Sequence, residues 1–260
     1  MILPRLSVSI VVYNNYERVK TIVQDIEAYT SHELTKKVFI IDNSEKTKSQ
    51  AEFQEYINTY NDVIYIFNNR NIGFGGGHNV VIPQLESDYH AIVNPDIEIN
   101  DDVFSSILMY MEKNKHVGMV IPKILDSNGD IQMAYRKEPT VFDMCIRMMC
   151  KSHFKRRQAE HTLQQMDYDK PFQVPFAQGC FLVVRTALLK EIKGFDERYF
   201  MYMEDADLSK RINEKSCVMY YPGASAVHKW EKGSHKSLKL MRIHVQSMIR
   251  YFNKWGWKIF

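Results

Sequence analysis

The stretch that decides the fold is residues 6–42, LSVSIVVYNNYERVKTIVQDIEAYTSHELTKKVFIID. Residues 6–13 are a short β-branched run, which is typical of a buried strand. Apolar residues then recur at helical spacing over residues 19–26. A second buried run covers residues 38–41 and ends at Asp42. A strand, a helix and a strand in that order predict a parallel β-α-β unit.

The same alternation continues outward from this unit. Further strands are predicted at residues 63–67, 91–93 and 117–121, with helices between them marked by apolar faces over residues 53–60 and 104–111. The fold class is therefore α/β, with a Rossmann-like, mostly parallel sheet and helices on both faces. Ligands of such sheets bind beyond the carboxyl ends of the strands. We therefore expect Asp42, the glycine-rich residues 68–79 and Asp96 to meet in one crevice.

The second half of the chain is less regular. Its predicted elements are a turn at residues 126–130, a basic and unassigned stretch at 139–172, strands at 178–184 and 217–221, and helices at 204–214 and 237–254. These elements indicate one domain over residues 1–236, divided at about residue 121, and a C-terminal amphipathic helical appendage over residues 237–260.

Composition narrows the class of protein. The chain has 260 residues and a net charge of +3, which fits one large domain and gives no indication of nucleic-acid binding. No cysteine pair has metal-ligand spacing, so free thiols in a reducing compartment are expected for Cys145, Cys150, Cys180 and Cys217. The opening residues lack the zones of a signal peptide, and no segment is apolar enough to span a bilayer. These observations favour a cytoplasmic protein.

Two carboxylates come after the predicted fourth strand, in Asn94-Pro-Asp96-Ile-Glu98. On an extended backbone both would turn toward one site, and oxygen ligands of this kind suit Mg²⁺ or Mn²⁺ bound together with substrate phosphates. The simpler interpretation is a turn and a helix start, because Asn100 and Asp101 are good N-caps. Taken alone, the motif favours the simpler interpretation.

The glycine-rich segment reads NNRNIGFGGGHN over residues 68–79. Its glycines allow the backbone to approach a ligand closely, and it leads toward a helix start, where anions bind well. It is not a P-loop, because no Gly-Lys-Ser/Thr comes after it. It is not a dinucleotide fingerprint either, because His78 occupies the third glycine position. A merely flexible loop is the alternative.

Three acidic residues cluster in Tyr202-Met-Glu204-Asp205-Ala-Asp207. Acidic side chains in a first helical turn are favourable with the helix dipole, which is explanation enough without a function. The functional interpretation is that one carboxylate is a general base. Glu204 and Asp205 would point about 100° apart, so only one of them faces the reacting atom. His228, taken alone, is typical of a structural histidine.

Together, and in this order, these segments resemble the inverting glycosyltransferases of family 2, which have the GT-A fold, and most closely their bacterial rhamnosyltransferase branch. The resemblance runs from Leu6 to about Ser234. It rests on SIVVYN at residues 9–14, IDNS at 41–44, NIGFGGGHN at 71–79, NPDIE at 94–98, GCFLVVR at 179–185, GFDERYF at 194–200 and EDAD at 204–207. The block at 71–79 is the most diagnostic, and residues 1–121 become the nucleotide-sugar half and 122–236 the acceptor half.

The resemblance implies a role for each matching residue. Donor-binding residues would be Tyr13, Asn14, Asp42, Asn71, Gly73, Phe74, Gly75, Gly76, Asn79 and Asn94. Acceptor-side residues would be Gly179, Cys180 and Glu204, and metal ligands would be Asp96, Glu98 and His228. Asp205 would be the catalytic base. Asp42 would bind the pyrimidine base of the donor.

The implied reaction is metal-dependent transfer of L-rhamnose from dTDP-L-rhamnose, or of a sugar from another pyrimidine nucleotide, to a lipid-linked saccharide in bacterial surface polysaccharide synthesis. Mg²⁺ or Mn²⁺ would be the cofactor. A transferase that uses a UDP-hexose or a UDP-N-acetylhexosamine is an alternative. A nucleotidyltransferase would explain Asp96 but leaves the acids at 204–207 without a role. The alternative of another class is a non-catalytic carbohydrate-binding or scaffold protein.

Two segments combine apolar and basic residues, as a membrane-surface segment requires. One is residues 141–157, and the other is the C-terminal end, where Met248, Ile249, Tyr251, Phe252, Trp255, Trp257 and Phe260 mix with Arg250, Lys254 and Lys258. The hypothesis is peripheral docking on the inner face of the cell membrane. The alternatives are that these aromatic residues complete the core, or that they form a homodimer interface.

Overall fold

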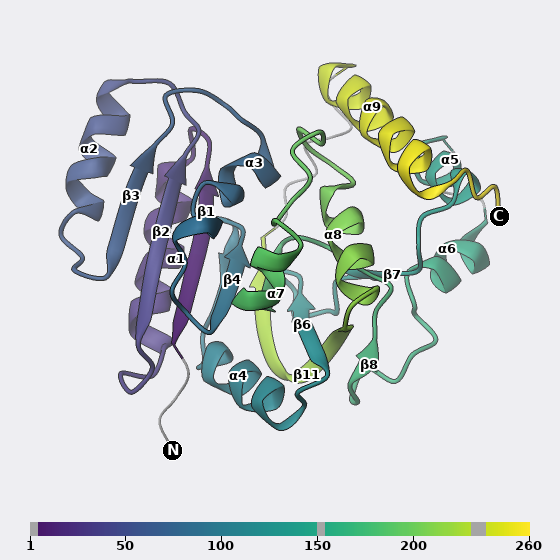
Figure 1. Ribbon diagram of the computed structural model, residues 1–260, viewed down its shortest axis with the longest axis horizontal. Helices are drawn as coiled ribbons and strands as arrows, with labels where there is room; N and C mark the ends of the chain where they lie inside the picture. Colours follow the sequence, from purple (N-terminus) through teal and green to yellow (C-terminus); the bar gives the residue numbers. More distant parts are fainter. Residues whose placement is uncertain (1–4, 150–153, 230–237) are drawn as a thin grey trace.

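The computed structural model describes residues 5–149, 154–229 and 238–260 (Figure 1). Cys150, the basic residues 151–153 and the predicted domain boundary at residues 236 and 237 lie outside the described residues. So does the C-terminal limit of the family resemblance, near Ser234. The elements below keep the labels of Figure 1.

The strands and helices alternate through the first half of the chain, as predicted. The strands are β1 Leu6–Val12, β2 Lys36–Asp42, β3 Val63–Phe67, β4 Tyr89–Val93, β5 Ile97–Glu98, β6 Val117–Leu125, β7 Tyr135–Arg136, β8 Phe172–Gln173, β9 Phe176–Ala177, β10 Phe181–Arg185 and β11 Cys217–His228. The helices are α1 Tyr16–Tyr29, α2 Lys48–Ile57, α3 Phe74–Asn79, η1 Ile82–Gln84, α4 Val103–Lys113, α5 Val141–Met149, α6 Lys155–His161, α7 Thr186–Glu191, α8 Glu204–Asn213 and α9 Leu238–Trp255.

The main sheet has the strand order β3-β2-β1-β4-β10-β6-β11-β5. Parallel pairing joins β3 to β2, β2 to β1 and β1 to β4, whereas β10 runs antiparallel to both β4 and β6. The chain moves outward from β1 to β3 and then returns to the other side of β1. The carboxyl ends of β1 and β4 therefore flank a topological switch point, the place where open α/β sheets bind ligands.

The α/β class and the predicted strands are confirmed, with local differences. The sheet is parallel in the nucleotide-sugar half but mixed around β10 and β5, because a short buried apolar run does not specify strand direction. The strand predicted at residues 178–184 begins only at Phe181. The helix expected to reach Tyr60 ends at Ile57. Residues 68–79, expected to form a loop, are helical from Phe74.

A three-residue bulge interrupts β11 where it pairs with β6. Tyr221 pairs with Pro122, and Ser225 pairs with Lys123, so residues 222–224 are extra on β11. Bulges of this kind bend a strand and redirect the residues that come after the bend. The strand was expected to stop at Tyr221, but it continues past the bulge to the crevice.

Two apolar cores hold the molecule together. The larger core lies on both faces of the sheet, and the smaller one joins α5, α8 and α9 through Met144, Ala206, Tyr251 and Phe252. Figure 1 shows α9 lying against the end of the sheet that carries α5 and α8. Within the described residues, no helix has both the length and the apolar character that crossing a membrane requires.

Candidate active site

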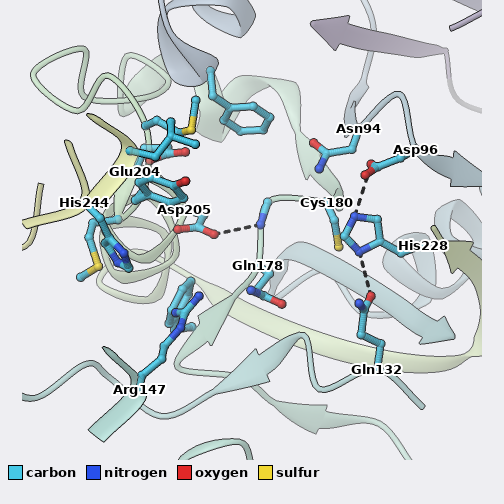
Figure 2. Close-up of a pocket in the computed structure, with 17 residues that line it drawn as sticks. Asn94, Asp96, Gln132, Arg147, Gln178, Cys180, Glu204, Asp205, His228 and His244 are labelled. Atoms are coloured by element: carbon cyan, nitrogen blue, oxygen red, sulfur yellow. Dashed lines mark hydrogen bonds and ion pairs between the residues drawn. The ribbon is translucent and has the colours of Figure 1, made fainter. Parts of the chain in front are cut away.

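A cavity of about 410 Å³ lies beyond the carboxyl end of β4 (Figure 2). Because β10 is antiparallel to β4, the residues just before β10 lie at the same edge of the sheet. Side chains from α8, α9 and the end of β11 close the remaining sides. The lining residues are Phe74, Asn94, Asp96, Gln132, Arg147, Phe176, Gln178, Gly179, Cys180, Met201, Tyr202, Met203, Glu204, Asp205, His228, Leu240 and His244.

Asp96 and His228 face each other at one side of this cavity. His228 is the last residue of β11 and pairs with Ile97 of β5, which places it beside the turn that carries Asp96. The His228 Nε2 atom lies 3.3 Å from Asp96 Oδ1, and the His228 Nδ1 atom lies 2.7 Å from Gln132 Oε1. Since Gln132 Oε1 accepts, Nδ1 carries the hydrogen, and a neutral ring then presents its Nε2 lone pair to the carboxylate.

Three buried polar atoms at this side have no hydrogen-bond partner among the described residues. They are Asn94 Oδ1, Asp96 Oδ1 and His228 Nε2. Buried acceptor atoms normally have a hydrogen-bond donor, so three such atoms without one at the same side of the cavity indicate a site for an electron-pair acceptor. A carboxylate oxygen, an amide oxygen and an imidazole nitrogen are all ligands of Mg²⁺ or Mn²⁺. The residues present therefore fit a divalent cation.

Glu98 does not join this group. It forms an ion pair with Lys229 and lines a second, small cavity with Arg18 and Thr21. The chain turns at Pro95 and Asp96 instead of staying extended, so the two carboxylates diverge. No cluster of three or more metal-ligating histidine, cysteine, aspartate or glutamate side chains forms in the described part of the chain. In this arrangement Glu98 stays apart from Asp96 and His228, and its role as a metal ligand stays a prediction without support from the geometry.

Asp205 lies across the cavity, in the first turn of α8. Its Oδ2 atom accepts the Gly179 N–H at 3.1 Å, and its Oδ1 atom accepts the Ala206 N–H at 2.9 Å. Burial raises the pKa of Asp205, and these two hydrogen bonds and the positive charges of Arg136 and Arg147 oppose that rise. A raised pKa makes a carboxylate a better proton acceptor.

Glu204, the neighbouring carboxyl group, is buried and has a different environment. Burial raises its pKa well above the ordinary value, and the negative charge of Asp205 adds to the effect. Its Oε2 atom has no hydrogen-bond partner in the described residues. Both observations favour a protonated Glu204 beside an ionised Asp205, a division of roles typical of catalytic carboxyl pairs. The family resemblance assigned the base to Asp205, and that assignment stays a prediction that this difference between the two carboxyl groups supports.

The backbone before α8 is strained. Tyr202 and Met203 have φ angles of 70° and 68°, in the left-handed region that residues other than glycine rarely adopt. Backbone strain of this kind persists only where the surrounding structure imposes it, and it concentrates at functional sites. Here it sets the direction in which Glu204 and Asp205 enter the first helical turn.

The glycine block serves packing more than ligand approach. A Cβ on Gly73, which has φ of +85°, would lie 2.3 Å from the Phe200 carbonyl oxygen, and one on Gly77 would lie 2.7 Å from Val11 Cγ2. Gly75 and Gly76 are buried within α3. Of the block, only Phe74 lines the cavity.

Asn71 and Asn79 also act within the fold. The Asn71 Oδ1 atom accepts the Gly73 N–H at 2.9 Å. The Asn79 Oδ1 atom accepts the Phe195 N–H, and its Nδ2 atom donates to the Phe195 carbonyl and to Glu197. The block therefore joins residues 71–79 to residues 194–200. Donor contacts by Asn71, Gly75, Gly76 and Asn79 stay predictions without support from the geometry.

Asp42, the last residue of β2, is fully buried and does not line the cavity. Its Oδ1 atom accepts the Ser44 N–H at 2.8 Å, and its Oδ2 atom accepts the Tyr65 hydroxyl at 2.5 Å. The carboxylate thus stabilises the loop after β2 and has no exposed oxygen for the pyrimidine base of a donor. Tyr13 is exposed, and Asn14 has a positive φ and donates its N–H to Ser44 Oγ. Base contact by Asp42 stays a prediction that requires one of its partners to move.

The three predicted acceptor-side residues, Gly179, Cys180 and Glu204, all line the cavity, and their contact with an acceptor stays a prediction. Cys180 is buried, which raises the pKa of its thiol to about 12 and leaves it protonated. Sequence reasoning missed Gln132 and Arg147, which carry no motif and come from the segments between the recognised blocks.

The mixed sheet, with helices on its faces and a cavity at its switch point, has the GT-A glycosyltransferase fold. A solved structure of GalNAc-T7 with UDP, GalNAc and Mn²⁺ shares this fold, with a TM-score of 0.69 and 16% identity, over 89% of this chain and 44% of that one. Residues 7–193 match the sequence profile of glycosyl transferase family 2, and the chain therefore belongs to that family.

Two relatives carry specific names. An N-acetylglucosaminyl-diphospho-decaprenol L-rhamnosyltransferase of Mycobacterium tuberculosis is 28% identical over 206 residues, which cover 74% of this chain and 66% of that protein. The rhamnosyltransferase WbbL of Escherichia coli K12 is 23% identical over 255 residues, which cover 93% of this chain and 90% of that protein. The chain thus spans slightly less than two thirds of the length of the mycobacterial relative.

Proposed function

We propose that this chain transfers L-rhamnose from dTDP-L-rhamnose to a lipid-linked saccharide, with inversion at the anomeric carbon. One observation carries the proposal: Asp205 and the Asp96–His228 pair face a single cavity from different sides. A single displacement requires a base at one side and, at another side, ligands for a cation that neutralises the leaving diphosphate. The sugar identity rests on the two rhamnosyltransferase relatives.

In the proposed reaction, Asp205 accepts the proton of an acceptor hydroxyl. The hydroxyl oxygen forms a bond to the anomeric carbon while the bond from that carbon to the donor phosphate oxygen breaks. The electron pair leaves with the nucleoside diphosphate. The Gly179 N–H, bonded to Asp205 Oδ2, fixes the direction of the carboxylate during this transfer. Attack from the side opposite the leaving group inverts the configuration.

Asp96, His228 and Asn94 would hold a divalent cation, Mg²⁺ or Mn²⁺. Such a cation supplies positive charge that stabilises the leaving diphosphate. The proposal gains support from the unpartnered acceptor atoms at this place. Gln132 fixes the ring of His228 through Nδ1 and thereby directs Nε2 into the site.

The donor is tested with a panel of nucleotide sugars, measured by release of the nucleoside diphosphate in the presence of a pyrophosphate-linked GlcNAc lipid. We expect turnover with dTDP-L-rhamnose to exceed turnover with UDP-hexoses and UDP-N-acetylhexosamines. Preference for a UDP sugar would replace the rhamnose assignment and keep the transferase. Absence of both transfer and donor hydrolysis with every sugar would favour the non-catalytic alternative.

The same proposal includes docking on an anionic membrane through the outer face of α9. Its exposed side chains Leu238, Met241, Val245 and Ile249 recur at intervals of three and four residues and form one stripe. Residues 238–260 contain five lysines and arginines and no aspartate or glutamate. Apolar groups beside an excess of cations complement an anionic lipid surface. Leu240 and His244 of the same helix line the cavity, so docking would bring the cavity to the lipid surface.

The two segments that the sequence suggested for membrane docking differ in how much of their apolar surface is exposed. Among the described residues of 141–157, Met144 and Ile146 are buried and Arg157 pairs with Asp143, whereas Phe154 is exposed. Docking through this segment stays a prediction. In the C-terminal segment, Tyr251 and Phe252 complete the small core, whereas Ile249, Trp257 and Phe260 stay exposed. The helix therefore has both an inner and an outer role.

Flotation with liposomes containing anionic lipid tests the docking. We expect binding at low salt, release at high salt, and reduced binding when Lys239 and Arg242 are both replaced by glutamine. Those two cations are exposed. The double replacement should leave transfer to a short soluble acceptor unchanged. An unbound wild-type protein at low salt contradicts the idea, and a dimer that the same replacements do not affect would favour the homodimer alternative.

A further inference from the structure

Two arginines beside the cavity lack the partners that buried arginines normally have. Arg136 lies on β7 and has a residue exposure of 9%, and its Nε atom is buried without a hydrogen-bond partner. Arg147 lies on α5 and lines the cavity. Among the described residues, none gives either guanidinium a hydrogen bond or an ion pair. By contrast, Arg185 bonds the Val117 carbonyl, the Met111 carbonyl and the Tyr89 hydroxyl.

Two cations near each other are unfavourable when they are withdrawn from water without a counter-charge. Burial, together with the charge of Arg147, lowers the pKa of Arg136 to about 9, although the negative charge of Asp205 opposes this change. The Arg136 guanidinium lies 5.8 Å from the centroid of the Phe176 ring, and Phe176 also lines the cavity. The Arg136 cation therefore lies against a ring of the cavity wall, although Arg136 itself is not one of the lining residues. Asp205 is one negative charge for the two arginines and forms no ion pair with either, so a further anion from another molecule would balance them.

The position of Arg147 separates this place from the donor phosphates. Figure 2 shows Arg147 on the side of Asp205 and His244, whereas Asp96 and His228 lie across the cavity. The donor diphosphate belongs with Asp96 and His228 in the proposed function. An anion at Arg147 therefore belongs to the other substrate, whose hydroxyl must reach Asp205. The cavity wall at this side is formed by α9, through Leu240 and His244.

We propose that Arg147 and Arg136 form an anion subsite that binds the phosphate or diphosphate of the acceptor. The inference rests on the proposed function and adds the residues that recognise the acceptor. The planar guanidinium fork matches phosphate oxygens in pairs, and two forks suit a diphosphate. With the diphosphate held at the arginines, the saccharide that it carries extends toward Asp205. The subsite thereby selects acceptors by their anionic linkage as well as by their sugar.

Binding of geranyl diphosphate, measured by titration calorimetry in EDTA, tests the subsite without any sugar transfer. Arg147→Gln should weaken geranyl diphosphate binding by about 10- to 100-fold, the usual range for a charge-assisted contact. Arg147→Lys keeps the positive charge but loses the planar guanidinium group. Its affinity for geranyl diphosphate should therefore lie between those of wild type and Arg147→Gln. The matched control is Arg156→Gln, because Arg156 is exposed and pairs only with Glu160; its affinity should stay within about twofold of wild type.

A parallel titration with dTDP distinguishes the two diphosphate sources. Arg147→Gln should leave dTDP affinity unchanged if the subsite serves the acceptor. Equal losses for dTDP and geranyl diphosphate, or an unchanged geranyl diphosphate affinity, would overturn the proposal. Since no transfer is needed, the expected result upholds the subsite even if the nucleotide-sugar panel shows no turnover. If Arg147→Gln does not fold, Arg147→Lys carries the same comparison.

Discussion

Replacement of Asp205 by asparagine separates the roles of the two neighbouring carboxyl groups. The two oxygens of Asp205 accept N–H groups from Gly179 and Ala206. Asparagine has a single acceptor oxygen, so one of those N–H groups must face an NH₂ group. A buried donor without an acceptor costs about 1–3 kcal/mol, and we expect Asp205→Asn to lower the free energy of unfolding by that amount. The protein should remain folded.

The catalytic loss should be larger than the loss of stability. Asparagine cannot accept the proton of the acceptor hydroxyl, and removal of a general base slows a reaction by about 10²–10⁴-fold. That factor corresponds to about 2.7–5.4 kcal/mol in the barrier. Glu204→Gln is the matched control, because the raised pKa of Glu204 favours its neutral form, and glutamine is also neutral. We expect its rate to stay within about tenfold of wild type.

The assay is single-turnover release of nucleoside diphosphate at a series of pH values. The base must be ionised, so the rate should fall as pH decreases through the pKa of Asp205. Because burial raises that pKa, the fall should begin above the pH at which an exposed aspartate titrates. The fall should be absent in Asp205→Asn. Loss of activity in Glu204→Gln with retention in Asp205→Asn would refute the reasoning and move the base to Glu204.

The metal site, a buried histidine and the C-terminal helix each give a further prediction. Exhaustive EDTA treatment should abolish transfer, and Mn²⁺ or Mg²⁺ should restore it. Asp96→Ala should be inactive, and His228→Ala should bind Mn²⁺ more weakly by calorimetry. Full activity without metal would contradict a role for the metal in transfer. Burial lowers the pKa of His90 to about 3 from 6.5. The unfolded chain therefore takes up a proton that the folded one does not, and below pH 6.5 stability should fall by about 1.4 kcal/mol per pH unit for this group, measured by urea unfolding; a flat profile between pH 6.5 and 4.5 would contradict it. Trp255→Phe removes the hydrogen bond from the indole N–H to the fully buried carboxylate of Asp207 in α8, and should lower the free energy of unfolding in urea by about 1–3 kcal/mol. The Trp257 ring is exposed, so Trp257→Phe should lower it by less than about 0.5 kcal/mol. Equal effects would contradict the anchoring role of α9.

Periodicity made the first half of the fold predictable. Each strand from Leu6 to Phe67 contains a short apolar run, and the helices between them carry a single apolar face. The direction of β10 was not predictable, because a strand buried on both faces reads the same in either direction. The order of the motifs predicted which residues would meet, and Asp96, His228 and Asp205 do share a cavity.

The functions of individual side chains were harder to predict. The motif at residues 94–98 suggested two metal ligands, but the turn at Asp96 sends Glu98 to Lys229. The aspartate after β2 suggested a base contact, but Asp42 is satisfied by the loop and by Tyr65. In both cases local backbone geometry decides where a carboxylate points, and spacing along the sequence does not encode it.

Arg136 and Arg147 escaped prediction for another reason. They lie in the stretch between the recognised blocks, where composition is mixed and no period is visible. What distinguishes them is that no described residue gives their guanidinium groups a hydrogen bond or an ion pair, and no pattern in the sequence indicates such an absence. The same holds for Gln132, whose role depends on its distance to His228.

The bulge in β11 affects the direction of His228 without affecting its place along the sheet. Residues 222–224 are extra relative to β6, because Tyr221 pairs with Pro122 and Ser225 pairs with Lys123. Deleting these three residues would leave Ser225 opposite Lys123, but it would remove the bend that a bulge gives a strand. His228, three positions beyond Ser225, would then approach Asp96 from a different direction. Deletions at this corner are therefore a route by which homologous chains can lose the histidine ligand without any substitution in the cavity itself.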